Sequence, residues 1–177
     1  KVDVPEKNYD RLASPVATVV MITTVDKEGR VNGASFATCF RNNHIPTCYE
    51  FSVDMHKDTA ANVLATGEFV VNMVTEELKD QMNITTSMVA FGVDEMKLAG
   101  LTPAPSTLVK PSRVKESPVA LECKYWRTIE LPVEKGHEAK RGSIVFGQVV
   151  GVHIDDRILK DGRVDIPPFR PIARLGY

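Results

Sequence analysis

The stretch Val16-Ala-Thr-Val-Val-Met-Ile-Thr-Thr-Val25 is dominated by β-branched residues and runs into the polar sequence Asp26-Lys-Glu-Gly29. β-Branched side chains favour extended strands, and a glycine supplies the positive φ that a tight turn needs. A second segment of strand character, residues 31–40, follows the turn directly. We therefore predict that residues 16–25 and 31–40 pair as a β-hairpin.

Further strand-like segments lie on the C-terminal side of this hairpin. Cys48–Asp54 alternates apolar and polar residues, as a half-buried strand does. The other predicted strands are residues 68–74, 119–131 and 143–154, with 135–142 as the exposed turn between the last two. One face of the last strand is expected to carry Ile144, Phe146, Val150, Val152 and Ile154.

Short helices are predicted between the strands. Asp58 is expected to cap a helix with an apolar stripe, and Gly67 stands where a left-handed stop belongs. Two shorter helices are expected over residues 76–82 and 94–99. Residues 101–117 contain three prolines and are expected to form an irregular loop lying over the domain.

Length and composition agree with one compact unit. The chain has 177 residues, of which 43% are apolar, so it can bury one sizeable core and is too short for two ordinary domains. We expect a single domain over residues 1–177. Six or more strands with helices inserted between them predict a mainly β fold, a closed or nearly closed antiparallel barrel.

Charge and hydropathy exclude several classes of protein. A net charge of −1 argues against a nucleic-acid-binding protein, which needs a basic face. No apolar run is long enough to span a membrane, and the first residues do not read as a signal peptide. Three cysteines without CxxC spacing predict neither a disulfide scaffold nor a thiolate metal site, so a cytoplasmic location is expected.

Common catalytic motifs do not occur in the sequence. The four histidines lie too far apart for a local metal pair, and we expect no metal site. GxSxG, P-loop and GxGxxG motifs are all missing. Cys39, Cys48 and Cys123 stand in apolar strand contexts, where buried inert thiols are expected.

The segment Asn32-Gly-Ala-Ser-Phe-Ala-Thr-Cys39 is unusual because its residues are small and hydroxyl-bearing. Small residues allow a planar ligand to approach the backbone, whose N–H and C=O groups can then bind its polar edge. The alternative is a weakly packed outer strand with Ser35 and Thr38 facing water. The residues alone leave both interpretations open.

The segment Ser52-Val-Asp-Met-His-Lys-Asp-Thr59 combines a strand end with a helix start. The Lys57 ammonium, the hydroxyls of Ser52 and Thr59, and the unpaired first-turn amides together form a plausible phosphate site. An ordinary capped helix with a solvated Lys57 is the alternative, and it is the one that these residues favour when taken alone.

The two segments, in this order, resemble the flavin reductase-like FMN-binding split-barrel family. The similarity extends from about Ser14 over nearly the whole remaining chain. It is carried by residues 30–36, Lys57-Asp-Thr59 with Asn62, and the motifs at 66–72, 92–95, 98–102, 116–123, 147–153, 161–165 and 170–176.

The resemblance implies a six-stranded antiparallel Greek-key split β-barrel with inserted short helices that binds FMN and forms a homodimer. The cofactor-binding residues that it implies are Ser35, Phe36, Ala37, Thr38 and Cys39 along the isoalloxazine, Ser52, Lys57 and Thr59 at the phosphate, and Arg174 near the C-terminus. It implies no catalytic side chain and no metal.

The expected function is that of an oxidoreductase of the NAD(P)H:flavin reductase type, with FAD as the alternative flavin. The rival is a flavoredoxin-like electron-transfer protein that exchanges electrons with a redox protein partner and does not use NAD(P)H. A barrel that has lost its flavin and serves as a binding module is a third reading. The family usually continues after the first site with a smaller segment than Cys39-Phe-Arg-Asn-Asn-His44, and this difference bears on nicotinamide stacking.

Overall fold

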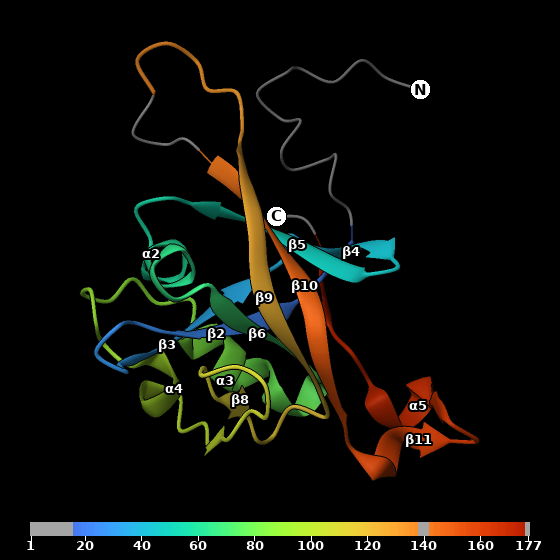
Figure 1. The fold of residues 1–177 in the computed structure, drawn as a ribbon. Coiled ribbons are helices and arrows are strands. Elements are labelled where there is room, and N and C mark those ends of the chain that lie inside the picture. The colour runs from blue at the N-terminus through green and yellow to red at the C-terminus, as the bar shows by residue number, and fades with distance from the viewer. Residues whose placement is uncertain (1–15, 138–141, 176–177) are drawn as a thin grey trace, which may run out of the picture.

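The computed structural model describes residues 16–137 and 142–175, and its centre is one antiparallel sheet (Figure 1). The sheet order is β3-β2-β6-β9-β10-β5-β4. Its strands are β2 (Val20–Val25), β3 (Val31–Phe36), β4 (Cys39–His44), β5 (Thr47–Asp54), β6 (Glu68–Met73), β9 (Val119–Glu130) and β10 (Gly142–Ile154).

The predicted hairpin is confirmed. β2 and β3 pair from Val20 opposite Phe36 to Val25 opposite Val31, and Gly29 has a φ of 83° in the turn. The prediction of one strand over 31–40 is wrong, because the chain bends at residues 37–38 and divides into β3 and β4. The main sheet therefore has seven strands rather than the expected six, and β3 and β4 form its two edges.

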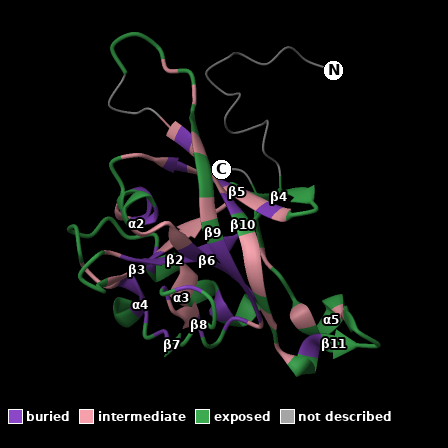
Figure 2. Cartoon of the chain, in the orientation of Figure 1, coloured by how far each residue is buried: buried purple, intermediate pink, exposed green. Residues whose placement is uncertain are grey.

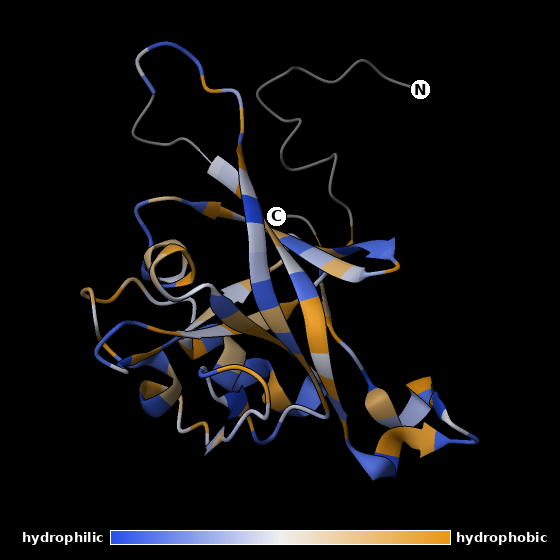
Figure 3. Cartoon of the chain, in the orientation of Figure 1, coloured by the Kyte–Doolittle hydropathy of each residue, from blue (hydrophilic) through white to orange (hydrophobic). Residues whose placement is uncertain are grey.

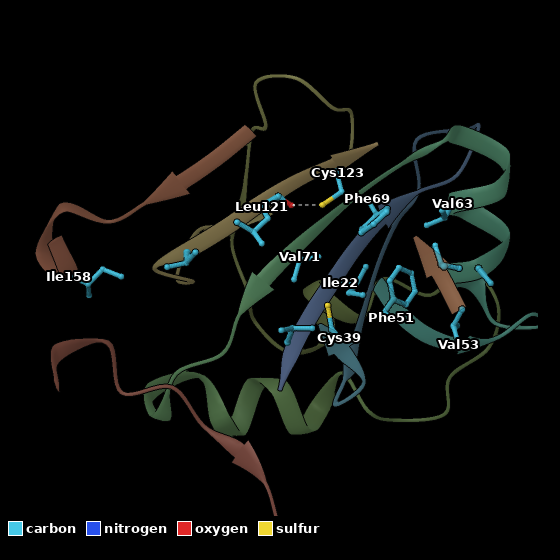
Figure 4. Close-up of a cluster of buried hydrophobic side chains, with 14 residues drawn as sticks. Ile22, Cys39, Phe51, Val53, Val63, Phe69, Val71, Leu121, Cys123 and Ile158 are labelled. Carbon is cyan, nitrogen blue, oxygen red and sulfur yellow. Dashed lines mark hydrogen bonds between the residues drawn. The ribbon is translucent and has the colours of Figure 1, made fainter. Parts of the chain in front are cut away.

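The interior of the curved sheet holds the main apolar core (Figure 4). Phe51 and Phe69 are fully buried and meet edge to face, with ring centroids 5.3 Å apart. Gly147 lies against this pair: a Cβ at this position would stand 2.4 Å from the Phe69 ring. A glycine is therefore needed where β10 crosses the core.

Helix α2 (Asp58–Thr66) covers one end of this core with Ala60 and Val63. Gly67 ends the helix as predicted, with a φ of 73° and its N–H donating to the Val63 carbonyl. The prediction that Asp58 caps the helix is wrong. Lys57 is the N-cap residue and makes no side-chain cap, while the Asp58 carboxylate accepts a hydrogen bond from Gly92 N–H at 3.0 Å.

Residues 101–117, which we call the strap, cross the other face of the sheet. They contain the short paired strands β7 (Pro103–Ala104) and β8 (Arg113–Val114), as well as irregular backbone. The short helices η2 (Glu76–Leu78), α3 (Lys79–Ile84) and α4 (Glu95–Leu98) contribute to the apolar cluster on this side. The expected loop over the domain is thus present and is anchored to the sheet.

The long strands β9 and β10 pair as predicted, but Ile144 and Phe146 do not share one face with Val152 and Ile154 as predicted, because the register shifts between them. Val145 is fully buried, while Val152 and Ile154 are exposed. Burial and hydropathy both vary along β10 (Figures 2 and 3). Register shifts after Phe146 and Val149 change which residues point inward along the strand. The predicted turn at 135–142 lies partly outside the described residues.

The C-terminal part of the chain packs beside the sheet through small elements. They are η4 (Asp156–Ile158), β11 (Leu159–Lys160), β12 (Arg163–Val164), α5 (Ile166–Phe169) and β13 (Ala173–Arg174), the last pairing with β1 (Ala17–Thr18). No helix in the described parts of the chain is long and apolar enough to cross a membrane.

Candidate functional site

A cavity of about 460 Å³ opens between β3, the end of β5 and the start of α2. The segment 85–89 and Gly142 complete its wall. This volume lies within the range of small-molecule sites, which run from roughly 300 to 1,000 Å³. Both sequence segments singled out for ligand binding contribute to this single cavity.

Hydrogen bonds join these two segments at both ends of the cavity. At one end, the backbone N–H of Ser52 donates to the Thr38 carbonyl at 3.2 Å. At the other end, Nδ2 of Asn32 donates to Oγ1 of Thr59 at 3.1 Å. The two segments, which we call the ring of the cavity, are therefore held together by the protein itself.

The open edge of β3 forms the first side of this ring. Gly33 N–H points away from β2 and donates to Oε2 of Glu95 at 3.1 Å. In an antiparallel strand, alternate residues present their N–H and C=O groups to the same side. Ser35, two residues further along, therefore directs its backbone groups toward the same open edge, where it lines the cavity.

The Ser35 side chain is also fixed. Its hydroxyl oxygen lies 2.6 Å from Oγ1 of Thr85 and 3.2 Å from the carbonyl oxygen of Met82. These contacts bind the end of α3 to the strand edge. The segment that follows α3 is consequently held over the cavity, where Met88 and Val89 line the wall and Met88 is 92% exposed.

The start of α2 forms the second side of the ring. The first hydrogen bond of this helix runs from Ala61 N–H to the Lys57 carbonyl, so the preceding amides have no partner within the helix. Lys57 makes no ion pair with any residue of the described ranges. An uncapped helix start, an ammonium and the hydroxyls of Ser52 and Thr59 are groups that suit a bound anion, and we call them the candidate anion site.

Three carboxylates, those of Asp54, Asp58 and Glu95, also line the cavity. Two of them are held by backbone donors, Asp58 by Gly92 and Glu95 by Gly33. Burial raises the pKa of Glu95, and the nearby charges of Asp58 and Asp94 add to this increase against the opposing hydrogen bond from Gly33. The cavity therefore places a buried carboxyl group, costly to ionise, near the candidate anion site.

Residues 12–166 match the family described as "Flavin reductase like domain". The chain belongs to the flavin reductase-like domain family. An uncharacterized protein of Aquifex aeolicus is 38% identical over 161 residues, which cover 88% of this chain and 78% of that protein.

Solved structures support the family assignment. The structure of nitrilotriacetate monooxygenase component B from Bacillus cereus is 28% identical, with a TM-score of 0.91 over 100% of this chain and 92% of that chain. Flavoredoxin of Desulfovibrio vulgaris (Miyazaki F) shares the fold, with 21% identity and a TM-score of 0.78 over 89% of this chain and 81% of that chain. The mainly β fold with its large antiparallel sheet is therefore similar to the expected flavin reductase split barrel.

This flavin reductase-like domain brings most of the predicted site residues into its cavity. The wall contains Ser35, Phe36, Thr38, Ser52, Lys57 and Thr59. They come from two regions of sequence, which hydrogen bonds join through Asn32 and Thr59 and through Ser52 and Thr38.

Ala37, Cys39 and Arg174 lie outside the cavity wall. Ala37 packs against the apolar cluster on the strap side of the sheet. Cys39 points into the main core, where burial raises the pKa of its thiol to about 12. Arg174 lies on β13 opposite Ala17. The bend after β3 turns Ala37 and Cys39 away from the strand edge along which Ser35 lies.

Other cavity residues were not predicted as ligands. Asn32 belongs to the small-residue segment 32–39, but its hydrogen bond to Thr59 joins residues that are distant in sequence. The residues 85–89 carry one usable signal, the hydroxyl run Thr85-Thr86-Ser87 between two helices. Glu95 has no local signal, because its contact with Gly33 spans 62 positions. The described residues contain no cluster of metal-ligating side chains.

Proposed function

We propose that this protein is an FMN-binding oxidoreductase that transfers reducing equivalents from NAD(P)H to flavin. The ring of the cavity, formed by the β3 edge and the start of α2, carries this proposal. A planar, polar-edged ring system fits a strand edge with free backbone groups, and a phosphate fits an uncapped helix start. FMN has both features in one molecule.

The donor set fits this ligand. Lys57 supplies a positive charge, while Ser52 and Thr59 supply hydroxyl donors for the phosphate. Asp58 and Glu95 already accept backbone hydrogen bonds, which hold the two carboxylates to the protein. The backbone N–H and C=O of Ser35 remain for the polar edge of the ring.

The protein's part in the reaction is binding, orientation and electrostatics. Bound flavin supplies the redox chemistry, as a hydride acceptor and electron donor. Lys57 and the start of α2 fix the phosphate end, and the β3 edge fixes the plane of the ring. Met88 and Val89 contribute apolar side chains to the cavity wall. None of these roles requires a side chain to act as a general acid or base.

We further propose that the protein is a cytoplasmic homodimer. Three unpaired buried cysteines suit a reducing compartment. Exposed apolar side chains on β9 and β10, including Trp126, Ile129 and Val152, offer a surface for a second copy. Light scattering coupled to gel filtration tests the assembly, and a monomeric mass at micromolar concentration contradicts it.

Anaerobic mixing with a nicotinamide tests the reaction. The protein is loaded with FMN, freed of excess ligand, and mixed with NADH or NADPH while flavin absorbance is followed. Rapid bleaching is expected. If only a reduced redox protein bleaches the flavin, the molecule is instead an electron carrier, the role for which flavoredoxin is named. If FMN does not bind, the cavity is not a flavin site and both functions fail.

A further inference from the structure

Asn32 lies at the end of the cavity where β3 meets α2, and its residue is only 4% exposed. Its Nδ2 donates to Oγ1 of Thr59 at 3.1 Å and to Oγ1 of Thr24 at 3.3 Å. Oγ1 of Thr24 also accepts from Nδ2 of Asn62 at 3.1 Å. This buried network uses both amide protons of Asn32 and fixes the orientation of its side chain.

The remaining polar atom of Asn32 is Oδ1, which accepts no hydrogen bond from any described residue. The buried polar side-chain atoms that lack partners in the described ranges belong to Gln81, Ser112 and Ser143. Oδ1 of Asn32 is not one of these enclosed atoms, so it is accessible from the cavity that Asn32 lines. The protein therefore presents a rigidly held acceptor to a ligand.

The position of this acceptor specifies which part of a ligand it meets. Asn32, Ala34 and Phe36 line the cavity along one face of β3, and Asn32 is the one bonded to Thr59 at the candidate anion site. A ligand whose ring lies along β3 and whose phosphate reaches Thr59 must pass its connecting chain beside Asn32. In flavins this chain carries hydroxyl groups, which can donate to an acceptor.

We propose that Asn32 is a positioning residue that binds a hydroxyl of the chain between ring and phosphate. The site then selects polyol-bearing flavins over the bare ring. This inference rests on the proposed flavin-binding function. The proposal gives Oδ1 of Asn32 a hydrogen-bond donor, which no described residue of the protein supplies. It also explains why the Asn32 side-chain amide is buried between Thr24 and Thr59.

Three ligands of increasing size test the proposal. Lumiflavin has the ring alone, riboflavin adds the hydroxylated chain, and FMN adds the phosphate. Their dissociation constants are measured by fluorescence quenching for the wild type, Asn32→Ala and Asn62→Ala. Asn32→Ala is expected to weaken riboflavin binding about five- to tenfold, as loss of one hydrogen bond does, and to leave lumiflavin binding within about twofold.

Asn62→Ala is the matched control. Asn62 belongs to the same network and is equally buried, but it does not line the cavity. This variant is expected to lower the thermal midpoint while leaving the ratio of riboflavin to lumiflavin affinity unchanged. A change in that ratio as large as in Asn32→Ala overturns the direct contact.

Asn32→Asp keeps the experiment decisive if the alanine variant does not fold. The aspartate retains an acceptor toward the cavity, so riboflavin binding is expected to stay within about threefold of the wild type. A tenfold loss with a native circular dichroism spectrum overturns the proposal. So does equal weakening of lumiflavin and riboflavin in Asn32→Ala, or weakening of neither. A wild type that binds none of the three ligands overturns the proposed function as well.

Discussion

Thr23 and Thr24 are neighbours on β2, and both are fully buried, yet they face opposite sides of the sheet. The Thr23 hydroxyl donates to the Ser112 carbonyl of the strap at 2.6 Å. Thr24 accepts from Asn32 and Asn62 beside the cavity. The two sides thus use similar polar side chains on the same sheet, and they differ in how completely those side chains are paired.

On the strap side the buried Glu122 and Asn72 side chains are completely paired, although Oγ of Ser112 has no hydrogen-bond partner in the described ranges. The fully buried Glu122 carboxylate accepts from the backbone N–H groups of Thr107, Leu108 and Val109, at 2.6 to 3.1 Å, and contacts His153 at 2.5 Å. Asn72 uses both its amide oxygen and its amide nitrogen. These paired groups therefore hold the strap to the sheet.

On the cavity side the pairing is incomplete. Lys57 has no ion pair in the described ranges, and Oδ1 of Asn32 and the first amides of α2 have no partner there. Buried polar groups in proteins are normally hydrogen-bonded to the protein, to water or to a ligand, so an unpaired group that lines a cavity suits a ligand. The contrast favours a structural role for the paired groups of the strap side and a binding role for the cavity side, and it predicts which substitutions affect stability and which affect binding.

The largest effect is expected from Glu122→Ala. The substitution leaves His153 and three backbone amides of the strap without their acceptor, and the amide of Val109 is buried, so the free energy of unfolding should fall by about 3–5 kcal/mol. Urea denaturation measures it, with Glu134→Ala at an exposed position as the control. FMN affinity of the folded fraction should stay unchanged. A stability loss below about 1 kcal/mol would contradict the structural role of the carboxylate.

Lys57→Ala should show the reverse pattern. Loss of a charged donor weakens FMN binding by about 1.5–3 kcal/mol, whereas stability and riboflavin affinity remain near wild type because riboflavin has no phosphate. Titration calorimetry with both ligands measures the difference, and Lys57→Arg should retain most of the FMN affinity. An unchanged FMN dissociation constant would remove Lys57 from the candidate anion site.

Substitutions of Ala34 and Ala37 test where the cavity side ends and the strap side begins. Ala34 lines the cavity, while Ala37, three residues later, packs on the strap-side cluster. Ala34→Leu should weaken flavin binding about tenfold by filling the cavity. Ala37→Leu should instead lower the thermal midpoint, because extra methylenes in a packed core cost about 1–3 kcal/mol. Equal flavin loss in both variants would place Ala37 in the binding site.

Local sequence patterns account for the parts of the fold that depend on neighbouring residues. The β2–β3 hairpin and the end of α2 at Gly67 follow from strand propensity and glycine geometry, and both are confirmed. The sequence does not indicate the bend after Phe36, because no glycine or proline stands there. The prediction that five apolar residues of β10 share one face fails because a register shift alters the alternation on which it depends.

The candidate site divides in the same way. The hydroxyl-rich and Lys57 segments are visible in the sequence because each concentrates suitable residue types. The contacts that complete the cavity are long-range, as between Asp58 and Gly92 or Glu95 and Gly33. Asp58 was therefore read as a cap, since nothing near it in the sequence indicates a partner 34 positions away.

The smallest expected effect concerns Glu95, a cavity residue whose ionised form is disfavoured by its surroundings. Because the pKa of Glu95 is raised in the fold, its contribution to stability is full below the ordinary glutamate pKa and declines as pH rises through the folded value. Glu95→Gln keeps an acceptor for Gly33 N–H and removes this penalty. At neutral pH we expect the variant to be more stable by about 0.5–1 kcal/mol.

Unfolding experiments across the acid range distinguish this electrostatic effect from repacking. The difference between Glu95→Gln and the wild type should vanish well below the ordinary glutamate pKa, where both side chains are neutral. The variant should also bind FMN slightly more tightly at neutral pH and leave riboflavin binding unchanged, because only FMN carries a phosphate near the removed charge. A stability difference that is constant with pH would show that packing around Gly33, and not the charge of Glu95, separates the two proteins.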